Sequence, residues 1–500
     1  MRIRYRRKIG RIALAIAGLF CASYLTGCGG GGAASFNVPP GSSALRAEPT
    51  GGQWVSIVLA SVGVVPAASP PAAGSPQANQ ERQELQSLQQ SRTAATDAAV
   101  NFWNAGAVLR WNEIARDLVK KHRTPPPVAS RLYALVSVAQ YDALIAAFHY
   151  KYLYNRPAPR QVDNAIQPLV ATTTDPVYPS EHAVVAAASA AVLAYLYPDE
   201  AGFVAGKARE HQESRLQAGV NWRSDIIAGD ELGRAVAAKI IERARADGAD
   251  SQLVARAALA LWWSPQTKAS RSEVLQAQAA TDPGRWTGTN PVLPEWGRVR
   301  PWLMSNVAQF RPDPPPAFDS PEFQAALAEV RQISDTRTAE QLRIAQFWAD
   351  GAGTSTPPGH WNQFACDQIA QHSLNEIRAA RTLALMNMAV MDAGICCWDA
   401  KYTYWLLRPW QADTAITTPV GQPNFPSYTS GHATFSGAAA EVLGYIFPDQ
   451  QASFRAMADE AALSRLYGGI HYRFDSDIGI EGGRRIGQLA IERGRADRSP

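Results

Sequence analysis

Cysteine is scarce in this chain of 500 residues, and this scarcity excludes two kinds of protein. Of the five cysteines, two precede residue 29, and the others are Cys366, Cys396 and Cys397, with no C-x-x-C spacing. So few thiols at these spacings exclude a disulfide-rich scaffold and a zinc site. A bridge from Cys366 to one of the two adjacent cysteines stays open, because sequence alone does not set disulfide connectivity.

Charged residues and alternating patterns are also sparse, which narrows the fold class. Charged residues make up 18% of the chain and hydrophobic ones 46%, with 37 glycines and 34 prolines. This composition excludes a wholly disordered, collagen-like or coiled-coil protein. No sustained alternation of apolar and polar residues follows residue 95, so no sheet is predicted. We expect a globular, helical chain of more than one domain.

Acidic residues are absent before residue 28, whereas six of the 48 basic residues lie before residue 12. Removing these six leaves 42 basic residues against the 44 acidic ones. The positive net charge therefore belongs to the leader, and the composition gives no electrostatic case for a nucleic-acid partner.

The leader has the pattern of a secretory signal peptide. An uncharged apolar run over residues 12–25 follows the basic start and precedes Thr26-Gly27-Cys28. The run is shorter than the roughly 20 residues that span a bilayer, so we predict a signal peptide over residues 1–27, with an uncleaved anchor helix as the alternative. The segment ending in Cys28 resembles a bacterial lipobox, in which the cysteine is lipidated.

This leader predicts an exported protein of a bacterium, either periplasmic or attached to the outer membrane through a lipid on Cys28. Residues 28–95 are rich in glycine, alanine, proline, serine and glutamine. We expect a linker of low order there, which would tether the body to the membrane surface.

The chain repeats itself at an offset of 250 residues. Trp111-Asn112 recurs as Trp361-Asn362, and identities at this offset continue to Lys151 and Lys401. Downstream, YPSEHAVVAAASAAVLAYLYPDE matches SYTSGHATFSGAAAEVLGYIFPDQ, and SRLQAGVNWRSD matches SRLYGGIHYRFD. Long runs rich in alanine and leucine and free of proline predict buried helices.

We therefore predict an all-α fold of two related four-helix-type bundles that arose by internal duplication. The first bundle spans residues 96–250, and the second, which carries the site, spans residues 325–496. A connector rich in proline and tryptophan, residues 251–324, joins them.

Three clusters in the second half predict an anion site. In the first, Lys401-x6-Arg408-Pro409, seven positions advance a helix by nearly two turns, so the two cations share a face. Paired cations can clamp a tetrahedral oxyanion. In the second, Ser430-Gly431-His432 precedes a helical run, where unpaired N–H groups and the helix dipole attract an anion.

The third cluster is Ser464-Arg465-x5-His471-x3-Asp475. Gly468-Gly469 should end the helix that holds Arg465, so we expect His471 to begin the next helix, with Asp475 one turn later. A carboxylate in that place would fix the tautomer of the imidazole and raise its basicity.

In this order and at these spacings, the clusters resemble the vanadium-dependent haloperoxidase and type 2 phosphatidic acid phosphatase superfamily, in which vanadate or phosphate binds between helices. The resemblance covers most of residues 282–490. It includes FWADGAGTSTPPGHWN at residues 347–362, which looks like the haloperoxidase branch. The resemblance also implies two related helical bundles and vanadate as the cofactor, with phosphate accepted by the same pocket.

By motif, the resemblance implies that the equatorial oxygens of the oxyanion are bound by Lys401, Arg408 and Arg465. The hydroxyl of Ser430 and the N–H of Gly431 would assist them.

His471 would be the axial vanadium ligand, or the nucleophile toward phosphate, and His432 the acid–base partner. Trp398 and Phe425 resemble aromatic residues on the halide side of chloroperoxidases, with core packing as the alternative. Asp350 would pair with Arg465.

The first half keeps most of the pattern but departs from it at two positions. Asn221 stands where the second half has His471, and Glu181 stands where it has Gly431. Asparagine cannot replace imidazole as a ligand or nucleophile, and glutamate would repel an oxyanion. The first bundle is therefore predicted to be structural, although it retains Lys151, Arg156, Ser180, His182, Arg215 and Asp225.

The leading functional prediction is a vanadate-dependent haloperoxidase that oxidises a halide with hydrogen peroxide. The alternative is a periplasmic acid phosphatase that hydrolyses a phosphate ester through a phosphohistidine. A third hypothesis, a non-catalytic surface lipoprotein that binds a partner, is disfavoured because the second constellation is intact beside an altered first one. No feature of the sequence specifies the halide, the organic substrate or the oligomeric state.

Overall fold

The structure is a computed structural model that describes residues 47–172, 174–250 and 282–500. Contacts divide the chain after Pro40, and all described residues belong to the second unit. The expected signal peptide, the lipidation site Cys28 and the first part of the expected connector lie outside the described residues. The export and lipid anchoring inferred from the leader therefore stay predictions.

The described residues form helices and no β-strand, which confirms the predicted all-α fold class. The helices of the first half are α1 (Pro76–Gln90), α2 (Ala94–Asn104), α3 (Ala107–Lys121), α4 (Pro126–Tyr154), α5 (Pro159–Val162), α6 (Glu181–Leu196), α7 (Ala201–Gln217) and α8 (Arg223–Arg245). Those of the second half are α11 (Pro321–Thr336), α12 (Ala339–Phe347), α13 (Thr356–Gln371), α14 (Glu376–Tyr404), α15 (Pro409–Ala412), α16 (Gly431–Ile446), α17 (Gln451–Tyr467) and α18 (Arg473–Ala496).

Helix starts and ends recur at the predicted offset of 250 residues from α4/α14 through α7/α17, and α8 and α18 also begin 250 residues apart. The short 3-10 helices Pro198–Glu200 and Pro448–Gln450 follow the same spacing. Equivalent helices begin for related local reasons: Ser180 caps α6 and Ser430 caps α16 through their side chains. The duplication itself stays a prediction, and these matched bounds are what it requires.

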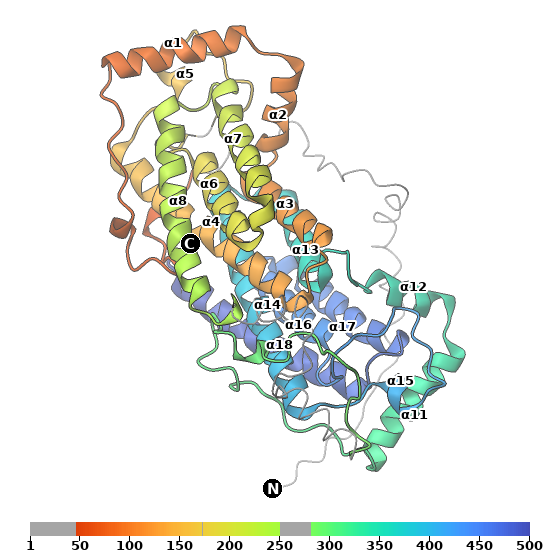
Figure 1. The fold of residues 1–500 in the computed structure, drawn as a ribbon. Helices are drawn as coiled ribbons and strands as arrows, with labels where there is room; N and C mark the ends of the chain where they lie inside the picture. The colour runs from red at the N-terminus through yellow and green to blue at the C-terminus, as the bar shows by residue number, and fades with distance from the viewer. Residues whose placement is uncertain (1–46, 173, 251–281) are drawn as a thin grey trace, which may run out of the picture. The chain divides into compact units, whose positions relative to one another are not determined.

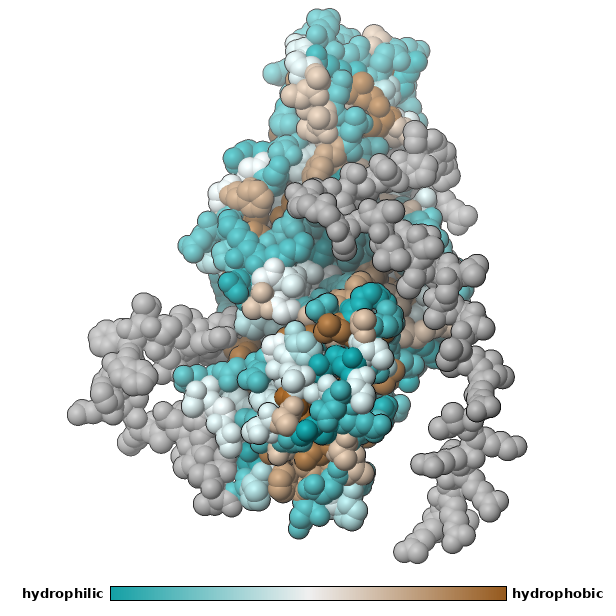
Figure 2. Space-filling view, turned by 90° about the vertical axis from the view of Figure 1, so that its right-hand side faces the viewer, coloured by the Kyte–Doolittle hydropathy of each residue, from teal (hydrophilic) through white to brown (hydrophobic). Residues whose placement is uncertain are grey.

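The long helices α4 and α14 have 29 residues each and pack against each other between the halves (Figure 1). Both are long and apolar enough to cross a bilayer, but nearly all of each apolar window is buried inside the protein, as in a core helix. Figure 2 shows hydrophilic residues over most of one face of the molecule, with hydrophobic residues in small separate patches. The apolar helix surface is thus used for internal packing.

The segment before each set of helices is ordered, which corrects the expectation of a low-order linker up to residue 95. We call residues 47–75 the first strap and residues 292–320 the second strap. Trp54, Leu59 and Val65 of the first strap are buried. The glycine- and proline-rich composition concealed these apolar anchors, which supply the burial that a true linker lacks.

A buried carboxylate holds each strap. Asp142 on α4 accepts hydrogen bonds from the backbone N–H groups of residues 57, 58 and 59 at 2.7, 2.7 and 3.1 Å. Asp392 on α14 accepts the same three bonds from residues 302, 303 and 304 at 2.7, 2.7 and 3.0 Å. The straps therefore also repeat, at an offset of 245 residues.

This second offset corrects the predicted domain bounds, because each half begins about 45 residues earlier than expected and takes in part of the predicted connector. A five-residue difference in spacing hid the earlier repeat from a comparison at an offset of 250. Three pairs of equivalent contacts combine the two offsets: Arg223–Glu84 with Arg473–Glu329, Trp103–Glu210 with Trp348–Glu460, and Arg92–Gln217 with Arg337–Tyr467.

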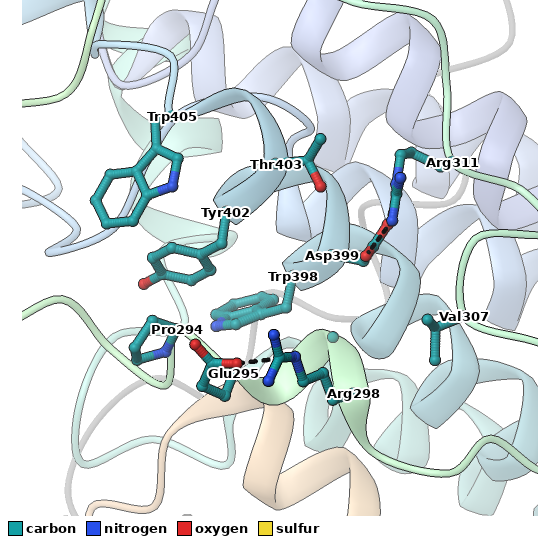
Figure 3. Close-up of a pocket in the computed structure, with 11 residues that line it drawn as sticks. Pro294, Glu295, Arg298, Val307, Arg311, Trp398, Asp399, Tyr402, Thr403 and Trp405 are labelled. Carbon is teal, nitrogen blue, oxygen red and sulfur yellow. Dashed lines mark hydrogen bonds and ion pairs between the residues drawn. The ribbon is translucent and has the colours of Figure 1, made fainter. Parts of the chain in front are cut away.

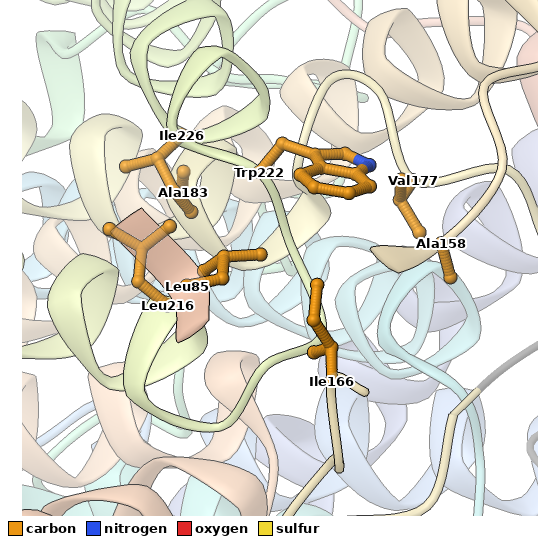
Figure 4. Close-up of a cluster of buried hydrophobic side chains, with 8 residues drawn as sticks. All are labelled: Leu85, Ala158, Ile166, Val177, Ala183, Leu216, Trp222 and Ile226. Atoms are coloured by element: carbon orange, nitrogen blue, oxygen red, sulfur yellow. The ribbon is translucent and has the colours of Figure 1, made fainter. Parts of the chain in front are cut away.

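Helices α1 and α11 cover one end of their respective halves. A buried cluster joins Leu85 of α1 to α5, α6, α7, α8 and the loop before α6 (Figure 4). In the second half, Phe323 and Val330 of α11 pack into a cluster with Tyr428 and Tyr472. These clusters fix the ends of the helices at which the motif residues of each half lie.

The bridge left open from Cys366 to Cys396 or Cys397 is absent. All three thiols are free and buried. Each lies near a different polar group, with the thiol of Cys366 near Asn112 and that of Cys397 near the carbonyl of Thr429.

We expect Asp392→Ala to lower the free energy of unfolding by about 2–4 kcal/mol, because three N–H groups of the second strap lose their acceptor. Asp392→Asn should cost less, since one acceptor oxygen remains. Urea denaturation followed by tryptophan fluorescence measures both, with the exposed Asp335→Ala as control. An unchanged stability in Asp392→Ala would show that the strap is held by its apolar contacts alone.

Candidate oxyanion site

Three cations of the second half are buried where its helices meet. Lys401 lies in the last turn of α14, Arg408 directly precedes α15, and Arg465 lies near the end of α17. Their exposed fractions are 0%, 0% and 1%. All three lower the pKa of His471 through their charges, which places them around one imidazole.

Lys401 is held by backbone oxygens. Its ammonium donates to the carbonyls of Pro426, Ser427 and Thr429 at 2.9, 2.8 and 2.5 Å. Burial lowers the pKa of Lys401 to about 7 because the charged form is desolvated, and neighbouring Arg408 acts in the same direction. The ammonium is thus oriented by carbonyl dipoles without a carboxylate partner in the described structure.

Arg408 keeps one nitrogen without a partner. Its Nε donates to the carbonyl of Phe425 at 2.9 Å, and its NH1 donates to the carbonyl of Ile470 at 2.7 Å and to Nε2 of His471 at 3.0 Å. Among the described residues, nothing accepts from its buried NH2. A buried guanidinium donor without an acceptor is costly, so this atom indicates a ligand.

Arg465 is also bound to neutral oxygens only. Its Nε donates to the Ser464 hydroxyl and its NH2 to the carbonyl of Ala345, both at 2.8 Å. Burial lowers the pKa of Arg465 to about 10, and the charge of Asp350 opposes the shift. The predicted Asp350–Arg465 pair is not formed, because Asp350 bonds to His360 Nδ1 at 3.1 Å instead.

The serine-glycine-histidine cluster forms the start of α16, as predicted. The side chain of Ser430 caps the helix by accepting from the N–H of Ala433 at 3.4 Å. A Cβ atom on Gly431 would meet nothing closer than the Trp398 ring at 3.7 Å. The glycine therefore leaves open space beside the unpaired N–H groups of the first helical turn.

His432, the second residue of α16, points a buried Nε2 atom that has no partner among the described residues. Burial sets the pKa of His432 well below its usual value, and the charge of Arg465 lowers it further. Backbone hydrogen bonds with Ala349 and Trp348 oppose this shift. The imidazole is neutral in the empty cradle and free to accept a proton.

His471 and Asp475 meet as predicted, although α18 begins at Arg473, after His471. Asp475 Oδ2 lies 2.8 Å from Nδ1 of His471 and accepts from the N–H of Tyr472 at 3.1 Å. Because Arg408 donates to Nε2, the proton of His471 resides on Nδ1, and Nε2 presents a lone pair. Burial lowers the pKa of His471 well below its usual value, with Arg408 as the next cause.

Ser427 completes this pair and was not found from the sequence. Its hydroxyl donates to Asp475 Oδ2 at 2.5 Å and lies 3.4 Å from Nδ1 of His471. Burial raises the pKa of Asp475 to about 6, while the hydrogen bond from Ser427 lowers it. The only signal was a serine three residues before Ser430, which is too common a pattern to single out.

Phe425 and Trp398 form an aromatic wall beside the cations. The Phe425 ring lies 5.1 Å from the Lys401 ammonium and 5.0 Å from the Arg408 guanidinium. Trp398 packs on Phe425 with 5.1 Å between ring centroids, and its Nε1 donates to the carbonyl of Val292 at 3.1 Å. Both residues lie where the halide prediction requires them, and their role toward halide stays a prediction.

Trp398 also borders a separate cavity of about 240 Å³ on its other side. Figure 3 shows Trp398, Tyr402 and Trp405 along the end of α14, with two ion pairs, Glu295–Arg298 and Arg311–Asp399, at the rim. The tryptophan thus forms a shared wall between this cavity and the turn at Gly431.

The cradle has an excess of positive charge. Lys401, Arg408 and Arg465 face Asp475 as the one carboxylate that the described structure brings to the histidine between them. Burying unbalanced charge is unfavourable unless a counter-ion completes the site. The charge excess, the two partnerless nitrogens and the open space at Gly431 fit a tetrahedral oxyanion such as vanadate or phosphate.

Comparison with known proteins agrees with this geometry. Residues 131–245 match the PAP2 superfamily, and residues 448–498 match the second helical-bundle domain of vanadium chloroperoxidase. The vanadium chloroperoxidase of Curvularia inaequalis is 27% identical over 192 residues, which cover 30% of this chain and 32% of that protein. The chain therefore matches about a third of the length of this relative.

Solved structures extend the likeness to most of the chain. A bacterial vanadium-dependent iodoperoxidase aligns with a TM-score of 0.59 at 26% identity, covering 77% of this chain and 94% of its own. A bacterial vanadium-dependent chloroperoxidase aligns with a TM-score of 0.54 at 15% identity, covering 75% and 93%. The second likeness concerns the fold alone.

The fold and the cradle define a helical oxyanion-binding protein of the PAP2 type. Within that class, the chain resembles the vanadium haloperoxidases, as its motifs predicted. These relatives support an enzyme rather than a binding protein.

The pKa of Lys401 predicts how anion affinity depends on pH. Above pH 7 the empty cradle holds a neutral Lys401, so binding a dianion must take up a proton, and affinity should fall by up to tenfold per pH unit. Between pH 6.5 and 7 the dependence should level off. Calorimetry with sulfate, whose own charge is constant in this range, measures it. A Lys401→Met variant should bind sulfate more weakly and lose this dependence, and an unchanged slope would exclude Lys401 as its source.

Proposed function

We propose that the chain is a vanadate-dependent haloperoxidase that oxidises a halide with hydrogen peroxide. The observation that carries this proposal is the buried cradle, in which three cations surround a histidine whose Nε2 atom is unprotonated. The titles of the structural relatives, a vanadium-dependent iodoperoxidase and a vanadium-dependent chloroperoxidase, support it.

In this proposal the chain holds the oxyanion by charge and by helix geometry. Lys401, Arg408 and Arg465 bind its oxygens, and the first turn of α16 contributes N–H donors at Gly431. The His471 Nε2 lone pair ligates the metal, while Asp475 fixes the proton on Nδ1. Bound vanadate would supply the Lewis-acid centre at which hydrogen peroxide becomes an oxidant for halide.

His432 handles the proton of the incoming peroxide. Its Nε2 is buried and without a partner in the described structure, and its low pKa keeps it neutral and ready to accept. Once an anion occupies the cradle, its negative charge raises the pKa of His432 and stabilises the imidazolium. The same group then returns the proton as the halide is oxidised.

The aromatic wall serves the halide side. Phe425 and Trp398 exclude water next to the cations, which strengthens electrostatic interactions there. We propose bromide or iodide as the halide, because chloride is the hardest of the three to oxidise.

The second candidate is an acid phosphatase that acts through a phosphohistidine. It is favoured by the match of residues 131–245 to the PAP2 superfamily and by the same unprotonated Nε2 of His471, which can attack phosphorus. His432 would then protonate the leaving alcohol.

Orthovanadate distinguishes the two candidates. A haloperoxidase should be activated by vanadate, with phosphate as a competitor for the same cradle. A phosphatase should only be inhibited, because vanadate imitates the five-coordinate state of phosphoryl transfer. Halide oxidation and ester hydrolysis are each assayed with and without vanadate. The absence of halide oxidation from acidic to neutral pH at saturating vanadate would favour the phosphatase.

We expect His471→Ala to abolish either activity, because it removes the atom proposed to bond to vanadium or phosphorus. His432→Ala should retain vanadate but lose about 10²–10⁴-fold in turnover, as expected for a lost acid–base group. Asn221→Ala and His182→Ala, at the equivalent positions of the first half, are the matched controls and should stay within a few-fold of wild type. Wild-type rate and vanadate affinity in His471→Ala would refute the site.

A further inference from the structure

The first half contains the same cations as the cradle of the second half, in the same places. Lys151 donates to the carbonyl of Pro176 at 2.6 Å, as Lys401 does to that of Pro426. Arg215 bonds to the hydroxyl of Ser214, as Arg465 does to that of Ser464. The exposed fractions of Lys151 and Arg215 are each 1%. The first half therefore buries the groups of an oxyanion site.

Glu181 lies where an oxyanion would lie. It takes the place of Gly431, as the first residue of α6, and forms an ion pair with Lys151. Its charge also raises the pKa of Arg215, against the larger effect of burial. One carboxylate thus acts on two of the three cations, from the position that Gly431 leaves open in the second half.

A second carboxylate neutralises the third cation. Arg156, the equivalent of Arg408, donates from NH2 to Oε2 of Glu81 on α1 at 2.8 Å. At the offset of the straps, Glu81 corresponds to Ala326 on α11. The same guanidinium nitrogen of Arg408 has no partner in the described part of the second half.

The charges of the two halves differ accordingly. In the first half, Asp225 also accepts from Arg156 NH1, at 2.7 Å, and the three cations are balanced by the three carboxylates Glu181, Glu81 and Asp225. In the second half, the three cations face Asp475 alone. The difference is two carboxylate groups, which is the charge of a tetrahedral dianion.

We propose that the first half is an oxyanion cradle that the chain occupies with its own carboxylates, Glu181 and Glu81. Each chain accordingly binds one tetrahedral oxyanion, and removal of these two carboxylates opens a second site of the same ligand class. Glu181 and Glu81 are tethered beside the cations, and a tethered group competes at high effective concentration against free anion. The inference rests on the oxyanion site proposed for the second half, but not on its chemistry.

The test counts bound inorganic phosphate per full-length chain by equilibrium dialysis. Wild type should bind one equivalent, and the double variant Glu181→Gly, Glu81→Ala should bind two. Adding Lys151→Met to the double variant is the matched control and should return the count to one. A folded double variant that binds one equivalent at millimolar phosphate would overturn the proposal.

The reciprocal exchange gives an answer even if the opened first half fails to fold. Gly431→Glu with Ala326→Glu should place the two carboxylates in the second cradle, where a Cβ on Gly431 has room. This variant should bind no phosphate and should lose the stabilisation by phosphate that wild type shows in thermal unfolding. Phosphate binding within threefold of the wild-type Kd would contradict the proposal.

Halide oxidation does not enter either count, so the outcomes separate. A wild-type chain that binds one phosphate and responds to both exchanges as expected, but oxidises no halide, supports the inference and rejects the haloperoxidase. A haloperoxidase whose second cradle still binds phosphate after the reciprocal exchange rejects the inference alone.

Discussion

The burial of three cations around one histidine is the constraint on which the rest of this site depends. Lys401, Arg408 and Arg465 are removed from water, and desolvation lowers the pKa of each. Carbonyl oxygens satisfy most of their donors but supply no negative charge. The cost of an unbalanced buried charge amounts to several kcal/mol, so a scaffold that holds the cations in place is poised to take up an anion. Anion binding and the stability of this half are therefore coupled.

The scaffold meets this cost by fixing the ends of its helices. The straps add buried apolar surface and are held by Asp142 and Asp392, each of which satisfies three backbone N–H groups that would otherwise lack partners. Helices α1 and α11 then close the ends at which the cations lie. Precise placement of donors before a ligand arrives is what an oxyanion site requires, because no reorganisation is then needed during the reaction.

The helices and the cations could be predicted from the sequence because both leave local patterns: proline-free alanine-rich runs, and charged residues at fixed spacings. Contacts between distant segments could not. Ser427 on Asp475, Asp350 on His360 and the straps on α4 and α14 depend on tertiary packing. The straps were read as a linker because composition averages over a segment, whereas a few buried side chains decide its order. Glu181 was predicted to repel an anion, but its ion pair with Lys151 shows that it replaces one.

The contrast between the halves separates what the fold determines from what single residues determine. Helices of the same length hold the same cations in both, yet one set is neutralised internally and the other is open, so the scaffold alone does not specify binding. By the same reasoning, the cradle does not choose between halide oxidation and ester hydrolysis, since both need a bound tetrahedral anion and an imidazole lone pair. The choice depends on what can approach opposite His471. Aromatic rings at Phe425 and Trp398 leave little room there for a bulky ester, but they accommodate peroxide and a halide ion, which is why this wall favours the haloperoxidase.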